Sequence, residues 1–240
     1  EKFRLVQGAE PSYNNFCDLD RLLQTITHVA AGFEVNRSGA IPYIAVGAKH
    51  GNPCGAAIGM SQKEALQGMV EGDSRAIFGG LVMTNFPLTE ELVETLLTHA
   101  QSSGRRLLDG VIIPSVTEGA IDMLRRKGDK CRLFVNPALQ ILGVESLDMV
   151  QRIRYVRGGF LTQPNYSFVM DLNDPDIEKI GELDEQQKDS LVLAWAVGST
   201  SNSNTITLVR KGQLIGNGVG QQDRVSAAEL AIKRAVDARH

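Results

Sequence analysis

Helix-like and strand-like segments alternate along the first part of this chain, and few architectures accommodate such an alternation. Phe3–Val6 and Ile41–Val46 are apolar runs of strand length, and between them Asp18–His28 carries leucine and isoleucine at helical spacing. The same order continues as far as Cys131–Val135. Short, nearly continuous apolar strands separated by helices are typical of a mostly parallel sheet covered on both faces. The pattern therefore predicts an α/β fold.

Caps and apolar runs locate further elements. Ser61 is predicted to begin a helix, because Glu64 three positions later completes a capping box, and Thr89 is predicted to begin another. The remaining predicted elements of this part are strands at Phe78–Met83 and Gly110–Ile113 and a helix over Thr117–Arg126.

Turn-prone residues interrupt the alternation at Pro137–Val144, which predicts a boundary near residue 145. The elements expected beyond it are an extended segment at Arg152–Leu161, helices at Asp184–Val197 and Val225–Val236, and a hairpin of Thr205–Arg210 and Leu214–Gly216 around Lys211–Gly212. We therefore expect residues 1–145 to form a first α/β domain and residues 146–240 to form part of a second.

Charge and composition argue against several classes of function. The formal net charge is -3 and no basic stripe occurs, so we expect no nucleic-acid partner. No apolar run reaches the ~18 residues that span a bilayer, and no signal-like segment begins the chain, so we expect a cytoplasmic protein without membrane contact. The three cysteines form no CxxC pair, so neither a metal site nor a disulfide framework is predicted. Because the chain begins at Glu1 rather than Met, we expect that an upstream segment has been removed.

The stretch that most suggests chemistry is Ile44–Gly55, where an apolar strand delivers Lys49 and His50 to its end and a loop rich in Gly, Pro and Asn follows. An imidazole exchanges a proton near neutral pH, and an adjacent ammonium stabilises developing negative charge. The pair therefore suits the attack of a weak amine on an acyl group. The alternative is that Asn52–Gly55 is an ordinary turn, with Lys49 solvated and His50 structural. Residue spacing considered alone favours that alternative.

Two later stretches carry polar groups that suit ligand binding. Ser199–Asn204 offers hydroxyls and amides between a helix and a strand, and such groups bind a carbonyl or cap the backbone. Gly216–Arg224 is a glycine-rich turn that runs into a helix, an arrangement that can bind phosphate. It matches neither GxGxxG nor a P-loop, so it predicts no nucleotide site by itself.

Five motifs, in order along the chain, resemble AICAR transformylase, a family of purine synthesis usually joined to IMP cyclohydrolase. The residues that carry the resemblance are Ser12–Asn15 with Asp18 (SYNN in the family), Lys49–Gly55 (KHANPCG), Phe78–Gly80 (SAFGG), Asp109–Pro114 (VIIAP), and Ser203–Asn204 followed by Gly216–Arg224 (SN followed by GIGAGQxSR). Five motifs in register are difficult to obtain by chance, and the resemblance extends over nearly the whole chain.

The resemblance implies cytidine-deaminase-like three-layer α/β domains, the second one incomplete, without the deaminase zinc. The implied reaction moves a formyl group from 10-formyltetrahydrofolate, as co-substrate, to the amine of AICAR or a related amine, and a homodimer is implied as well. His50 then transfers the proton, Lys49 is its electrostatic partner, and Asn204 holds the formyl oxygen as it becomes an oxyanion. The residues implied to bind or line the substrates are Asn15, Phe78, Gly79, Asp109, Gln221 and Arg224.

Some parts of the family pattern do not occur in these 240 residues. The N-terminal RYGxNPHQ motif, the SDAFFPF stretch and a final Arg-Phe-His segment are absent, and Gly198–Thr200 stands where the family commonly has a Lys before its SN. Arginines of these segments would give bidentate contacts to a substrate phosphate. Three explanations stay open: a fragment of the full enzyme, a shortened enzyme for a different amine, or a non-catalytic binding protein on a degenerate transformylase fold.

Overall fold

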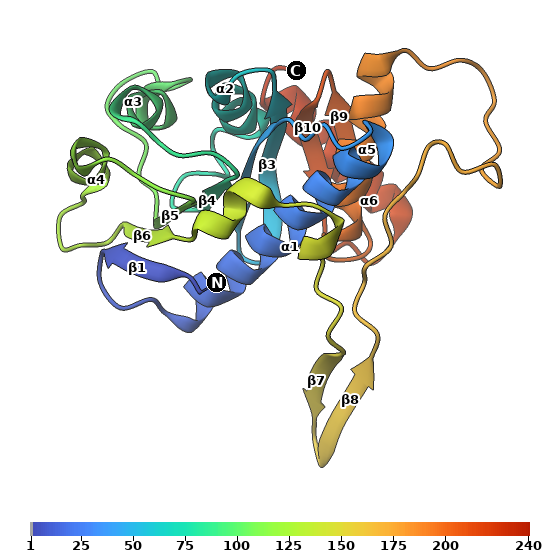
Figure 1. The fold of residues 1–240 in the computed structure, drawn as a ribbon, viewed down its shortest axis with the longest axis horizontal. Helices are drawn as coiled ribbons and strands as arrows, with labels where there is room; N and C mark the ends of the chain where they lie inside the picture. Colours follow the sequence, from blue (N-terminus) through green and yellow to red (C-terminus); the bar gives the residue numbers. More distant parts are fainter. Residues whose placement is uncertain (1) are drawn as a thin grey trace.

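The computed structural model describes residues 2–240, which form an eight-stranded sheet, a two-stranded hairpin and six α-helices (Figure 1). The strands are β1 (Arg4–Gln7), β2 (Tyr43–Lys49), β3 (Asn52–Gly59), β4 (Leu81–Thr84), β5 (Gly110–Ile113), β6 (Arg132–Val135), β7 (Arg152–Val156), β8 (Gly159–Gln163), β9 (Ile206–Arg210) and β10 (Gln213–Gly218). The helices are α1 (Tyr13–Asn36), α2 (Gln62–Gly72), α3 (Glu90–Thr98), α4 (Glu118–Leu124), α5 (Glu185–Ser199) and α6 (Arg224–Asp237), with 3₁₀ turns η1 (Pro137–Ile141) and η2 (Val144–Ser146).

The large sheet has the order β1-β6-β5-β4-β2-β3-β10-β9 and is mixed. Parallel pairing is confined to β4 with β5 and β5 with β6, and the other neighbours pair antiparallel. The α/β prediction is thus confirmed as a mixed sheet flanked by helices, while the expected mostly parallel pairing holds for three strands. For two of the antiparallel pairs the reason is that tight turns join β2 to β3 and β9 to β10, and a tight turn can connect only antiparallel strands.

Apolar side chains fill both faces of this sheet. One core cluster joins α2, α3 and α4 to the sheet through residues such as Leu66, Val93 and Val111. The other joins α1 and α5 to the opposite face, through residues such as Ile26 and Leu193. Each fully buried side chain of this kind contributes roughly 1.5–3 kcal/mol to folding. The two clusters therefore fix the strand ends from which the candidate site is built.

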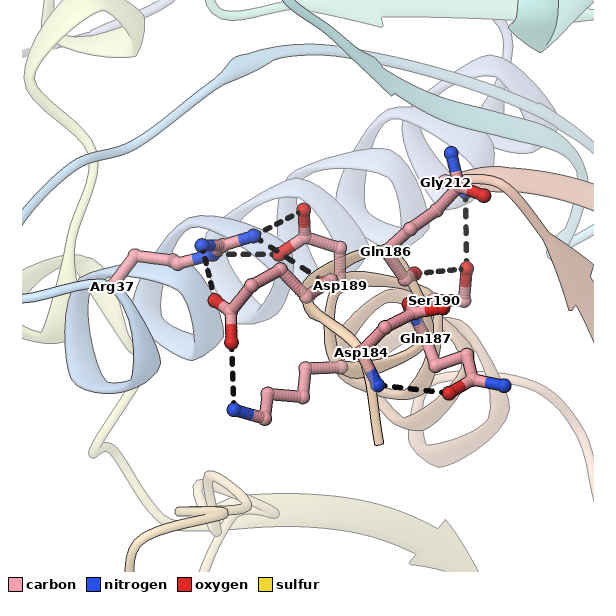
Figure 2. A network of polar contacts seen from close by, with 9 residues as sticks. Arg37, Asp184, Gln186, Gln187, Asp189, Ser190 and Gly212 are labelled. Carbon is pink, nitrogen blue, oxygen red and sulfur yellow. Dashed lines mark hydrogen bonds and ion pairs between the residues drawn. The ribbon is translucent and has the colours of Figure 1, made fainter. Parts of the chain in front are cut away.

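Helices α1 and α5 pack against each other, and charged groups join them where α1 ends and α5 begins (Figure 2). The guanidinium of Arg37 donates to both carboxylate oxygens of Asp189 at 2.7 Å and to the carboxylate of Glu185 at 2.7 Å. The hydrogen bond to Asp189 raises the pKa of Arg37. A bidentate guanidinium–carboxylate pair has a fixed geometry, so it sets the position of α5 along α1.

Several predicted elements are confirmed with small changes in length. The capping box at Ser61 is present, since the Ser61 hydroxyl accepts from the Glu64 backbone and the Glu64 carboxylate accepts from the Ser61 backbone. The strand at Gly110–Ile113 has the predicted bounds. The helix predicted over Asp18–His28 is longer, because a second capping box at Ser12 starts it at Tyr13.

The loop predicted over Asn52–Gly55 is wrong, because these residues are the first half of β3. The chain reverses at His50–Gly51 alone, where φ is 54° and 72°. Positive φ at both central residues is the geometry of a two-residue hairpin turn that matches the strand twist. Pro53, which has no N–H for the sheet, lies where the β2–β3 register shifts between Gly47 and Ala48.

The segment between η2 and α5 carries β7 and β8, a hairpin that projects away from the body of the molecule (Figure 1). The extended segment predicted at Arg152–Leu161 is therefore two strands with a turn between them. Its large apolar side chains, among them Tyr155 and Phe160, are 81% and 68% exposed. An isolated two-stranded hairpin is marginally stable in water, so this arm gains little from burial within its own chain.

Strands from both sides of the predicted boundary near residue 145 belong to one sheet, since β10 pairs with β3. The division into residues 1–145 and 146–240 stays a prediction. No helix in the part of the chain from residue 2 to residue 240 has both the length and the apolar character to cross a membrane.

Candidate functional site

Lys49 and His50 lie together on the wall of a cavity of about 320 Å³. Strand β2 ends at Lys49, and the tight turn places His50 outside the sheet, where it is exposed. The Lys49 ammonium donates to the backbone oxygen of Phe78 at 2.6 Å, which fixes the position of the cation. The rest of the wall comes from β3, the end of α2, β10 and α6. An imidazole and an ammonium therefore share one concave site.

The loop that carries Asn204 contacts the turn that carries His50. The backbone N–H of Asn202 donates to the Asn52 side chain at 3.1 Å, and the Asn52 amide donates to the backbone oxygen of His50 at 3.3 Å. The Asn202 backbone oxygen accepts from Gly220 at 2.8 Å. The three motifs predicted to carry chemistry are thus brought together, although Asn204 itself does not line the cavity.

Both N–H groups of the Asn204 amide are already used. They donate to the backbone oxygens of Gln221 at 3.1 Å and Gln222 at 3.2 Å. The Asn204 backbone pairs with Gln221 in both directions as well. A carboxamide has only two N–H donors, so in this arrangement its free capacity is that of an acceptor, through Oδ1.

Arg21 binds both the turn at His50–Gly51 and the loop at Thr200–Asn204, which we call the two site loops. Sequence reasoning missed this residue. Its Nε donates to the backbone oxygen of Gly51 at 2.9 Å, its Nη1 donates to the backbone oxygen of Thr200, and its Nη2 lies 3.4 Å from the Asn202 side-chain oxygen. Burial lowers the pKa of the Arg21 guanidinium, and the charge of Arg152 lowers it further. The helical spacing of Asp18, Arg21 and Thr25, a polar stripe on α1, was the available signal.

Asp18 and Asn217 also form hydrogen bonds with residues at the candidate site. The Asp18 carboxylate accepts from the Gly51 backbone at 2.5 Å. The buried Asn217 amide donates to the backbone oxygen of Pro53 and to the Ser201 hydroxyl, both at 3.0 Å, and its oxygen accepts from two threonine hydroxyls of β9 and its approach. Every donor of Asn217 is satisfied, which makes it a structural link rather than a free ligand.

Two other predicted residues lie beside Lys49. Phe78 is 49% exposed, and its backbone oxygen accepts a hydrogen bond from the Lys49 ammonium. Gly79 has a φ of 71°, which favours glycine, and a Cβ there would lie in ordinary contact with the Lys49 Nζ at 3.7 Å, so this backbone is adjacent to the ammonium. Asp109, one strand further along, forms an ion pair with Arg126 at 2.9 Å and does not line the cavity.

The remaining predicted residues, Asn15, Gln221 and Arg224, stand at helix starts or in the glycine-rich loop. Asn15 is buried, and its oxygen accepts from the Ser12 backbone and hydroxyl at 2.9 Å, which caps α1. The Gln221 amide donates to the backbone oxygen of Val219 at 2.9 Å. Arg224 is exposed at the first position of α6. None of the three lines the cavity of Lys49 and His50 within residues 2–240.

Cys54 and a partly buried ion pair complete the cavity wall. Burial raises the pKa of the Cys54 thiol to about 12, so the thiol stays protonated near neutral pH and is a poor nucleophile. Asp73 and Arg234 pair at 3.0 Å and join the end of α2 to α6. The chemistry available at the wall is therefore proton transfer and charge stabilisation rather than thiolate attack.

Comparison with known proteins gave a match along almost the whole chain. A profile of the family described as AICARFT/IMPCHase bienzyme matches residues 1–234. The bifunctional purine biosynthesis protein PurH of Staphylococcus carnosus (strain TM300) is 35% identical over 234 residues, and that of Staphylococcus aureus (strain JH1) is 31% identical over 232 residues. Each alignment covers 97% of this chain and 42% of the relative, so the chain spans less than half of the length of these relatives.

One solved structure, Acinetobacter baumannii RibD, form 2, superposes with a TM-score of 0.32 at 13% identity, covering 52% of this chain and 37% of that chain.

Proposed function

The chain belongs to the AICARFT/IMPCHase bienzyme family, and from this membership we propose that it is a folate-dependent formyltransferase of purine biosynthesis, working in the cytoplasm. It would move a formyl group from 10-formyltetrahydrofolate to the amine of AICAR or a related amine. The observation that carries the proposal is the joint position of Lys49 and an exposed His50 on the wall of one cavity of about 320 Å³. That volume is within the usual range for small-molecule sites.

The proposed step joins the amine nitrogen to the formyl carbon and breaks the bond from that carbon to N10 of the folate. An arylamine with a delocalised lone pair attacks weakly, so its proton must leave as the new bond forms. His50 takes that proton and returns one to N10, which leaves as an amine. The Lys49 ammonium stabilises the negative charge that collects on the formyl oxygen.

We assign Asn204 a hydrogen bond to the same formyl oxygen, which it can donate only after a rearrangement. One of its N–H groups must first leave a backbone oxygen, and the bond to Gln222 at 3.2 Å is the longer of the two. The residues proposed to position the substrates around this centre are Asn15, Phe78, Gly79, Asp109, Gln221 and Arg224. Of these, Phe78 and Gly79 lie nearest to the Lys49 ammonium.

The proposed architecture is cytidine-deaminase-like, with a first domain over residues 1–145 and part of a second over residues 146–240. A homodimer is proposed with it. The exposed apolar side chains of the β7–β8 hairpin support this, because they gain little burial within one chain and a second copy would cover them. Light scattering after size exclusion, with Tyr155→Ser/Phe160→Ser as the variant, tests the dimer. A monomeric wild-type protein would contradict it.

Formyl transfer can be measured directly. The protein is incubated with 10-formyltetrahydrofolate and AICAR while release of tetrahydrofolate is followed, with the His50→Ala protein as the blank. A panel of other amines, including an amino sugar and an amino acid, separates a shortened enzyme with a different acceptor from an AICAR transformylase. Release with no amine of the panel above the blank would rule out a formyltransferase.

A second candidate, a non-catalytic binding protein on the same fold, is favoured by one observation. Both N–H groups of Asn204 are held by backbone oxygens, so this amide does not face a ligand as a donor. Calorimetry with a purine nucleotide and with a folate distinguishes the candidates. Unchanged affinity in Lys49→Ala, together with the absence of formyl transfer, would favour the binding protein.

A further inference from the structure

A second and larger cavity, of about 730 Å³, lies where the chain enters β5 and β6. Its wall is formed by residues from the end of α3, the end of α4 and the segments that lead into these two strands. The cationic residues of the wall are Arg105, Arg106, Arg125, Arg126, Lys127 and Lys130. No Asp or Glu of residues 2–240 lines the cavity. Since the whole chain has a net charge of -3, this is a strong local excess of positive charge.

Carboxylates outside the wall neutralise only part of this charge. Arg105 pairs with Glu94 at 2.7 Å, Arg126 with Asp109 at 2.9 Å, and Arg125 with Asp122 at 3.6 Å. Lys127 and Lys130 are exposed and form no ion pair with any residue from 2 to 240. The wall therefore keeps two ammonium groups that no carboxylate of residues 2–240 neutralises in an ion pair.

Arg106 is the most unusual member of the wall, because it is only 1% exposed and forms no ion pair with a carboxylate of residues 2–240. Its guanidinium donates to the backbone oxygen of His99 at 2.7 Å and to that of Leu96, while its Nε has no hydrogen-bond partner in the described chain. Burial lowers the pKa of Arg106 to about 10, which still leaves it charged near neutral pH. A buried charge without a counter-ion costs free energy that a bound anion would offset.

We propose that this cavity is a binding site for a small polyanion with two or more phosphate or carboxylate groups. A single inorganic ion would fill little of 730 Å³, whereas an extended polyanion reaches several of the cations at once. Guanidinium forks bind both phosphate and carboxylate oxygens in bidentate geometry, so the wall is chemically suited to either group. The inference is independent of the formyl-transfer proposal, because Lys49 and His50 line the other cavity.

Isothermal titration calorimetry on the whole chain tests the site, with tripolyphosphate and citrate as the two probes and sodium chloride of equal ionic strength as the reference. The informative variant is Lys127→Glu/Lys130→Glu, which changes two exposed side chains of the wall. The matched control is Lys2→Glu/Lys179→Glu, which makes the same change in net charge at exposed lysines that do not line the cavity. Arg106→Met removes the buried cation as a second, independent change.

We expect at least one probe to bind wild type and the control within a factor of about two, and to bind the Lys127/Lys130 variant at least tenfold more weakly, since two favourable charge contacts become unfavourable. A preference for tripolyphosphate would assign the natural anion to phosphates, and a preference for citrate to carboxylates. No binding of either probe to the wild-type protein would overturn the proposal, and so would equal weakening in the control. If Arg106→Met does not fold, the lysine variant decides the result by itself.

Discussion

The turn at His50–Gly51 and the loop around Asn204 both carry side chains predicted to act in catalysis, but they use their hydrogen-bonding groups differently. The turn is held through its backbone groups, which bind the side chains of Asp18, Arg21 and Asn52, and the His50 imidazole is exposed. The loop is fixed by the side chain of Asn204 itself, whose two N–H groups bind backbone oxygens. A side chain that holds its own loop is less available to a substrate than one that the backbone presents. The two regions should therefore respond differently to mutation.

The largest effect is expected at the turn. His50→Ala should lower kcat/KM for formyl transfer by roughly 10²–10⁴-fold, which is the usual contribution of a general acid–base group. Because the imidazole is exposed, the thermal unfolding temperature should stay close to that of the wild type. His99→Ala, which removes an imidazole that is paired with Glu71 and does not line the cavity, is the matched control. Equal losses in the two variants would show that His50 has no special role.

Lys49→Met should have the second largest effect. Removing one group that stabilises an oxyanion typically lowers kcat by about 10²–10³-fold. The loss should fall on kcat more than on KM, since the charge develops only in the transition state. Lys63→Met, which removes an exposed ammonium paired with Glu91, controls for the change in net charge. A pure KM effect would mean that Lys49 binds the ground state instead.

Arg21→Met tests whether the two regions act together. The variant loses two hydrogen bonds from a charged donor to the oxygens of Gly51 and Thr200, each of which contributes roughly 1.5–3 kcal/mol. We expect a lower unfolding free energy in urea and a fall in kcat/KM of about tenfold, because both loops lose their common anchor. Arg37→Met removes a comparable guanidinium from the other end of α1, so it should lower stability without this loss of activity.

The smallest effect on catalysis is expected at Asn204. Asn204→Ala removes two hydrogen bonds to backbone oxygens, which should lower the unfolding free energy by about 1–3 kcal/mol. Its kcat should fall by less than that of Lys49→Met, because the amide contacts the oxyanion only after one of these bonds is exchanged. Ser203→Ala is a neighbouring control. A loss of about 10³-fold in kcat at unchanged stability would show that Asn204 is a free oxyanion donor and would remove the contrast between the two regions.

Local sequence patterns predicted much of this fold because local physics governs those elements. The Ser61 capping box and the hairpin turn at Lys211–Gly212 depend on residues that are neighbours in the chain, and the buried strand Gly110–Ile113 is visible in the sequence as a continuous apolar run. The strand start at Asn52 escaped prediction, since Gly, Pro and Asn favour a loop unless neighbouring strands supply the hydrogen bonds. Tertiary pairing with β2 overrides that local preference.

The amino-acid order was sufficient to establish the family, because its five motifs occur in register, and to identify Lys49 and His50 as residues at one strand end. Only the folded chain decided that Arg21 joins the two site loops and that the donors of Asn204 are occupied. Hydrogen bonds between residues that are 17 to 179 positions apart depend on how helices and strands pack, and no local pattern encodes them. A motif therefore shows which chemical group is present, whereas the packing shows whether that group is free to act.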